Sequence, residues 1–181
     1  MSSTINRFKR ADAQMAAMRV INLVRDLVDR IEEVGSRRRG SAEVGDIELL
    51  AIPRGYRNLF GETKRDTEPI SKALHTAGFE ILKGGEKYIQ FIMPLAGSLR
   101  IPVDLFLTTP EQFGIIQIIR TGPADFSHQF VTSYAFGGWM PANYRVQDGW
   151  LTKDGEPVIT REEEDVFRAI GREWISPRER R

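Results

Sequence analysis

Cysteine is absent from this chain of 181 residues, and histidine occurs only twice. The lack of cysteine excludes disulfide bonds, zinc sites built from thiolates and a cysteine nucleophile. Charge of one sign is also scarce, because 26 basic and 25 acidic side chains leave a formal net charge of only +1. No general excess of positive charge therefore indicates a nucleic-acid partner, and any such partner must be recognised by local basic clusters.

Long apolar runs are missing as well. No stretch approaches the roughly 20 apolar residues that cross a membrane, and the N-terminal sequence MSSTINRFKRADAQ has no hydrophobic signal-peptide core. We therefore expect a soluble cytoplasmic protein with no membrane partner. Hydrophobic residues make up 41% of the chain, which suits one globular domain or two small lobes.

The first part of the chain reads as a mixed α/β lobe. Helical spacing predicts a long helix over residues 11–31 with an apolar stripe of Met15, Met18, Ile21, Val24 and Val28. A second helix is expected over residues 67–78. Strands are expected over residues 31–35, 46–52 and 99–108, with a hairpin over 79–95 that turns at Gly84-Gly85.

The second part changes character, with a boundary expected between residues 108 and 121. Two helices are predicted on either side of Thr121-Gly122-Pro123, and a small hairpin with two Asp-Gly turns follows over residues 143–158. A last helix over residues 160–171 would begin with a capping box formed by Thr160 and Glu163.

The stretch GSRRRGSAEVGDIELLAIP, residues 35–53, carries the most chemistry. Gly-Ser running into a short helix offers backbone N–H groups to a phosphate, and Arg39 lies one helical turn after Ser36. On a strand, Asp46 and Glu48 would project from one face, and Asp104 lies in an apolar strand, where a carboxylate is costly unless it is paired or bound to a metal. Hard oxygen ligands beside a phosphate suit Mg²⁺, although an acidic pair on a strand is otherwise typical of a solvated sheet face.

The combined pattern resembles the X-family DNA polymerases. GSRRRG…GDIE, PVDLFLT and RTGPADF are similar to the family's G-S-x-R-R-G…G-D-x-D motif, its V-D-L strand and its T-G-S or T-G-P turn. The resemblance continues through KGGEKY, NYRVQDG, TREEEDVF and ISPRERR, and covers nearly the whole chain from about Phe8. The chain is thereby similar to the minimal, virus-encoded members, which lack an N-terminal lyase domain.

The resemblance implies an α+β fold. Residues 1–108 would form a nucleotidyltransferase palm, a mixed sheet with helices on one face, and residues 109–181 a small α/β thumb. The implied function is a DNA polymerase of a phage or virus, which adds nucleotides to a primer 3′-hydroxyl in short gaps, as in DNA repair. The implied partners are gapped or primer-template DNA and a dNTP, the implied cofactor is Mg²⁺ or Mn²⁺, and we expect a monomer in the cytoplasm of a bacterial or virus-infected cell.

Site residues follow from the same resemblance. Asp46, Glu48 and Asp104 match the three metal-binding acids, with Asp104 placed to activate the primer hydroxyl. The nucleotide-binding positions are matched by Gly35, Ser36, Arg39, Gly45, Thr121 and Gly122. The DNA-binding positions are matched by Lys83, Lys87, Asn143 and Tyr144. The family's turn also leads us to expect a cis Gly122-Pro123 peptide bond, whose cost proline lowers.

The sequence departs from the family at four places. Glu48 stands where the family has aspartate, Pro102 replaces a common arginine, Ile119 and Arg120 replace aromatic residues before the turn, and Val131 replaces an arginine that often touches the template. Two other functions stay open: a nucleotidyltransferase that modifies a tRNA, a protein or a drug, and a DNA-end-binding protein with little or no catalysis.

Overall fold

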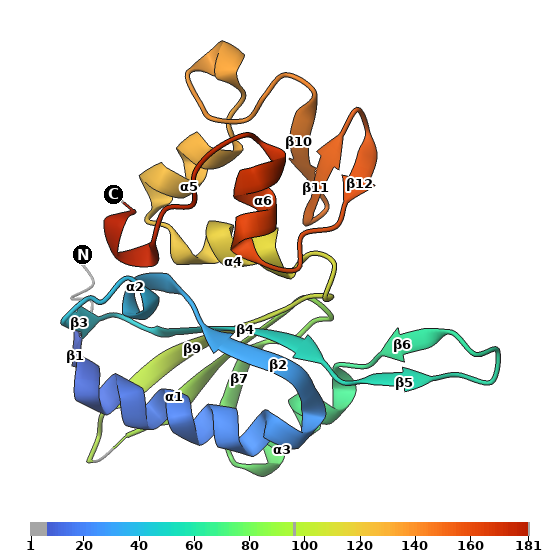
Figure 1. Cartoon of the computed structure of the whole chain (residues 1–181). Coiled ribbons are helices and arrows are strands. Elements are labelled where there is room, and N and C mark those ends of the chain that lie inside the picture. The colour runs from blue at the N-terminus through green and yellow to red at the C-terminus, as the bar shows by residue number, and fades with distance from the viewer. Residues whose placement is uncertain (1–6, 96, 181) are drawn as a thin grey trace. The chain divides into compact units, whose positions relative to one another are not determined.

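A five-stranded sheet, with largely apolar central strands, forms the first part of the computed structural model, which describes residues 7–95 and 97–180 (Figure 1). The strand order is β2 (Val28–Glu33), β4 (Ile47–Pro53), β9 (Arg100–Leu107), β8 (Tyr88–Pro94) and β7 (Glu80–Lys83). β4 and β9 run parallel and the other neighbours antiparallel, so the sheet is mixed. This confirms the predicted α+β class and the hairpin over residues 79–95.

One face of the sheet buries the core of the first unit. α1 (Arg10–Val24) and α3 (Glu68–Thr76) pack on the alternate strand residues that include Leu49, Phe91 and Leu105. The predicted stripe of α1 is displaced, because Met15 and Met18 are 68% and 42% exposed. The helix buries the predicted Val24 together with Ala13, Ala16, Ala17 and Val20, which were not predicted. These keep the 3.6-residue spacing, but the prediction gave weight to large side chains and missed the small ones.

The first helix is also shorter than predicted. It ends at Val24, a 3₁₀ turn, η1 (Arg25–Leu27), follows, and β2 begins at Val28. Residues 28–33 pair with β4, with Ile31 opposite Ala51. β-Branched side chains favour a strand. The long-range pairing with β4 therefore makes residues 28–33 a strand and not a continuation of the helix.

Two small two-stranded sheets complete the first unit. β1 (Phe8–Lys9) pairs with β3 (Glu43–Val44), and β5 (Gly55–Arg57) pairs with β6 (Thr63–Arg65). The β5–β6 hairpin was not predicted. Its turn is organised by the Asn58 side chain, whose Oδ1 accepts hydrogen bonds from the backbone N–H groups of Phe60 and Glu62 at 3.0 and 2.9 Å.

The chain divides into two compact units, which are described separately. The first takes in the described residues up to Glu33 and then Ser41–Leu107, and the second takes in Val34–Gly40 and the chain from Thr108 onward. The short helix α2 (Gly35–Arg38), which the prediction counted with the first lobe, thus packs with the second unit. The main division falls at Leu107.

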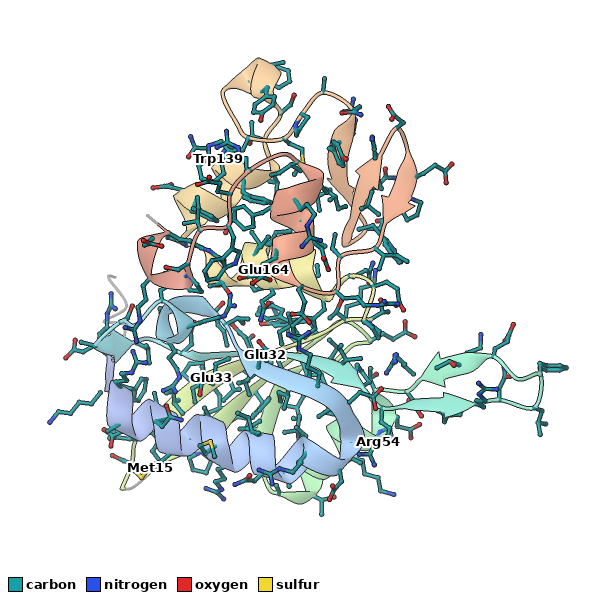
Figure 2. All side chains as sticks on the ribbon, in the orientation of Figure 1. Met15, Glu32, Glu33, Arg54, Trp139 and Glu164 are labelled. Carbon is teal, nitrogen blue, oxygen red and sulfur yellow. The ribbon has the colours of Figure 1, made fainter. Side chains whose placement is uncertain are left out.

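The second unit combines helices with a three-stranded sheet. α4 (Phe113–Thr121), α5 (Ala124–Val131), the 3₁₀ turns η2 (Tyr134–Phe136) and η3 (Pro177–Glu179), and α6 (Glu163–Ala169) surround an apolar core. Trp139, labelled in Figure 2, packs on this core, and its ring lies edge-on to those of Phe126 and Phe130. The sheet contains β10 (Tyr144–Gln147), β11 (Trp150–Lys153) and β12 (Glu156–Val158), so the predicted hairpin gains a third strand.

Local sequence signals in the second unit were partly right. Both Asp-Gly turns have positive φ at both residues, as tight hairpins require. The predicted capping box was wrong, because Glu162 caps α6 in a reciprocal pair with Asp165. Glu163 is buried instead, where two arginines bind it. The cis prediction was also wrong, since the Gly122–Pro123 peptide bond is trans.

Candidate functional site

Two neighbouring parallel strands bring the predicted acids together in the first unit. Glu48, the second residue of β4, is the direct register partner of Asp104 in β9. Residues in register on adjacent strands project from the same face of a sheet. Asp46 lies in the bend just before β4, after Gly45. The two strands thus place all three predicted acids near one end of β4.

The pKa of Asp46 shows the electrostatic influence of a neighbouring acid. Burial raises the pKa of Asp46 above its ordinary value of 3.8, and the negative charge of Asp104 raises it further. Both effects penalise the ionised form of Asp46. A cation bound between the carboxylates would relieve both.

The acids are not preassembled into a metal centre. Within residues 7–95 and 97–180, no group of three or more His, Cys, Asp or Glu side chains is arranged to hold a metal ion. The donor set nevertheless fits a divalent cation, because three carboxylates are hard oxygen ligands of the kind that Mg²⁺ prefers. The register of Glu48 with Asp104 on neighbouring strands is the structural observation that supports this fit.

Asp104 is further held by two donors from β8, which sequence reasoning missed. The Tyr88 hydroxyl donates to Oδ1 of Asp104 at 2.5 Å, and the Gln90 amide Nε2 donates to the same oxygen at 3.0 Å. Tyr88 and Gln90 are two residues apart, so they share a face of their strand. That alternation was visible in the sequence YIQFIMP, but the register with Asp104 was not.

The predicted phosphate-binding residues belong to the second unit. Gly35 opens α2 with a φ of 66°, a conformation that favours glycine, and Ser36 is half-buried in the first turn. Arg39 caps the C-terminus of α2, and its NH1 donates to the backbone oxygen of Thr121 at 2.6 Å. The predicted Arg39 and Thr121 are thus in contact.

Thr121 and Gly122 are closely packed within the second unit. The Thr121 side chain is fully buried and its hydroxyl accepts a hydrogen bond from Arg38 at 3.0 Å. A Cβ atom on Gly122 would lie 2.6 Å from both the Phe126 ring and the Ser127 hydroxyl. Packing by itself therefore accounts for glycine at position 122.

A buried ion-pair network that was not predicted underlies this segment. Glu163 is 2% exposed, and its two carboxylate oxygens accept hydrogen bonds from both terminal nitrogens of Arg38 and of Arg180, at 2.6–3.1 Å. Trp174 Nε1 adds a fifth donor at 3.3 Å. Burial alone would raise the pKa of Glu163, but the hydrogen bonds and charges of Arg180 and Arg38 outweigh it and hold the pKa below its ordinary value.

The predicted DNA-binding residues lie on the surfaces of the two units. Lys83 ends β7 and Lys87 precedes β8, and both side chains are exposed. Asn143 is exposed and donates to Asp154 Oδ2 at 3.4 Å. Tyr144, at the start of β10, packs on the apolar core of its unit instead of lying fully open to solvent.

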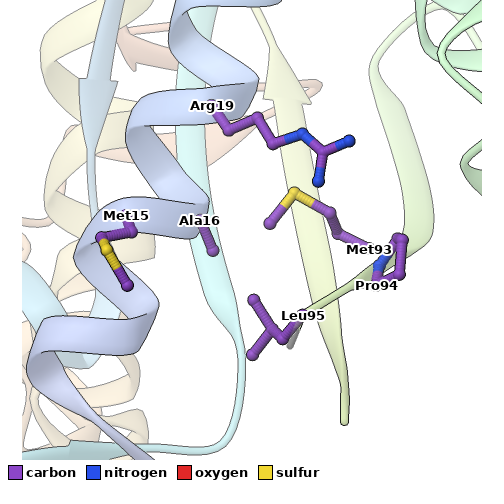
Figure 3. Close-up of a pocket in the computed structure, with 6 residues that line it drawn as sticks. All are labelled: Met15, Ala16, Arg19, Met93, Pro94 and Leu95. Carbon is purple, nitrogen blue, oxygen red and sulfur yellow. The ribbon is translucent and has the colours of Figure 1, made fainter. Parts of the chain in front are cut away.

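A groove elsewhere in the first unit contains none of the predicted site residues. Six residues from α1 and the end of β8 line it (Figure 3): Met15, Ala16, Arg19, Met93, Pro94 and Leu95. Apart from Arg19 its lining residues are apolar, and none is an acid or a nucleophile, so it does not compete with the acids as a catalytic site.

The arrangement of acids and donors is the strongest indication of function in this chain. In the described part of the chain, no helix has the length and apolar character that crossing a membrane requires. A comparison with protein-family models and with curated proteins finds no match for this chain.

Proposed function

We propose that this chain is a nucleotidyltransferase of the DNA polymerase type, which adds nucleotides to a primer 3′-hydroxyl in gapped or primer-template DNA. The observation that carries the proposal is the charge coupling of Asp46 and Asp104, with Glu48 in register beside Asp104. Acids whose pKa is shifted by burial together with a charged neighbour are candidates for functional sites.

Asp46, Glu48 and Asp104 would hold Mg²⁺ or Mn²⁺ in this proposal. When bound, such ions neutralise the acids and stabilise the negative charge that develops on a transferring phosphoryl group. Glu48 is one methylene longer than the aspartate of the family, and the strand still aims it to the face that Asp104 occupies.

The remaining residues have roles in binding and in proton transfer. Attack of the primer 3′-oxygen on the α-phosphorus of the dNTP forms an ester bond and releases pyrophosphate, and the proton of the primer hydroxyl passes to Asp104. The proposal assigns the triphosphate to Ser36 and Arg39, whose hydroxyl and guanidinium suit phosphate oxygens. Lys83 and Lys87, exposed and cationic, would contact the DNA backbone.

A primer-template extension assay with each dNTP, in Mg²⁺ and in Mn²⁺, tests the proposal. Addition that follows the template base supports it. Transfer of a nucleotide to a tRNA, protein or drug acceptor, without extension of DNA, would assign the acids to another nucleotidyltransferase. Binding of DNA ends without turnover would leave only a binding function.

Acid-to-amide variants locate the activity in these residues. Asp46→Asn should remove nucleotide addition, because the amide keeps the shape of the side chain but not its charge. Asp26→Asn is the matched control, since Asp26 is an exposed acid in the same unit and its replacement should leave the rate unchanged. Equal loss in the two variants would point to a general effect of charge and would contradict the assignment.

A further inference from the structure

Among the described residues, the hydrogen bonds donated to the Asp104 carboxylate reach one and the same oxygen. Tyr88 and Gln90 both donate to Oδ1, at 2.5 and 3.0 Å. No described residue donates a hydrogen bond to Oδ2. The structure thus distinguishes the two oxygens, although Asp104 is only partly buried and water could otherwise bind either one.

The strand of Asp104 supplies no side-chain donor to its carboxylate, so both donors come from β8. Pro102 and Phe106 lie two residues to either side of Asp104 on the same face of β9, and neither has a side-chain donor. On the other side, β4 presents the acid Glu48 in register. Of the two neighbouring strands, only β8 therefore offers side chains that bind a carboxylate.

Sheet register fixes the place of both donors. Gln90 is the direct cross-strand partner of Asp104, and Tyr88 is the partner of Phe106. The Tyr88 ring stacks on Phe106 with centroids 5.2 Å apart and an interplanar angle of 21°. The Tyr88 ring thus has a packing contact on Phe106 in addition to the bond from its hydroxyl to Asp104.

We propose that Tyr88 and Gln90 are positioning residues that hold Asp104 by Oδ1 and leave Oδ2 to meet the primer hydroxyl. The positioning role rests on the proposed function, and it explains why the Asp104 carboxylate has this orientation. Both donors are neutral, so they orient the carboxylate without adding a counter-charge beside Asp46 and Glu48.

Two variants remove the donors and retain the packing. Tyr88→Phe deletes one hydroxyl and retains the stack on Phe106, and Gln90→Met keeps a side chain of similar length without an N–H. Tyr56→Phe is the control, because it makes the same deletion on a half-exposed tyrosine of the same unit.

Steady-state kinetics should show a selective loss of turnover. We expect kcat for templated addition to fall about 10- to 100-fold in each donor variant. This is the typical effect of removing the hydrogen-bond partner of a side chain that binds a metal ion. KM for the dNTP and the unfolding temperature should not change, and Tyr56→Phe should match the wild type in all three. A fall in the unfolding temperature with kcat unchanged would make the two residues purely structural and would overturn the proposal.

Two readouts do not depend on turnover. Crystal structures of the variants should show Asp104 in more than one rotamer, and Mn²⁺ added alone, followed by electron paramagnetic resonance, should bind about 10-fold more weakly. A single wild-type rotamer with unchanged Mn²⁺ affinity would refute the positioning role. If the wild type adds no nucleotide to DNA, the proposed function fails, while these two readouts still decide whether Tyr88 and Gln90 hold Asp104.

Discussion

Replacing Glu163 with glutamine removes the charge at the centre of the buried network in the second unit. The amide has the shape of the carboxylate, but its NH₂ group would face guanidinium donors in place of an acceptor oxygen. Arg180, whose side chain is fully buried, would lose its counterion. Arg38, at 21% side-chain exposure, would lose the same partner.

The structure sets the size of the effect. Removing one partner of a buried ion pair costs about 3–5 kcal/mol, because the remaining charge stays buried and unpaired. For a chain of this length each 1 kcal/mol lowers the unfolding temperature by about 2–4 °C, so we expect a fall of about 6–20 °C. Glu164→Gln is the matched control, since Glu164 is the next residue along the helix and is exposed (Figure 2).

The pH dependence of stability gives a second measure of the same network. The pKa of Glu163 lies below its ordinary value of 4.5, so the unfolded state binds more protons. The stabilisation is therefore complete above pH 4.5 and is lost as the pH falls through the lower, folded value. Urea unfolding across this range should show the slope in the wild type and a reduced slope in Glu163→Gln. A variant within about 0.5 kcal/mol of the wild type at pH 7 would refute the reasoning.

Three further predictions concern the site and its packing. Gly122→Ala should cost about 1–3 kcal/mol by overpacking against the Phe126 ring, measured by urea unfolding; an unchanged midpoint would contradict it. Asp46→Asn should raise the stability at pH 7 by removing repulsion with Asp104, measured by calorimetry; a loss would contradict it. Glu48→Gln should abolish nucleotide addition in Mg²⁺ and Mn²⁺ alike; wild-type activity would exclude it as a ligand.

Local patterns predicted most of the elements. The hairpin over residues 79–95 followed from alternation around Gly84-Gly85, and the Asp-Gly turns followed from a requirement for positive φ that few residues meet. These signals lie within a few residues of the structure that they specify. The β5–β6 hairpin was not predicted because its turn depends on the side-chain hydrogen bonds of Asn58, which composition does not reveal.

Long-range contacts account for what the sequence did not predict. Arg38 and Glu163 are 125 residues apart, and no local pattern pairs them. Glu163 was instead interpreted as part of a capping box, since its spacing from Thr160 fits that motif. In the same way, Tyr88 and Gln90 could not be assigned to Asp104 before the register of β8 on β9 was known.

Single-turnover extension of a gapped DNA primer by Asp104→Asn shows whether Asp104 takes part in nucleotide addition. We expect templated addition by the wild type in Mg²⁺ and none by Asp104→Asn, with unchanged unfolding temperature. Addition by Asp104→Asn at the wild-type rate would contradict it.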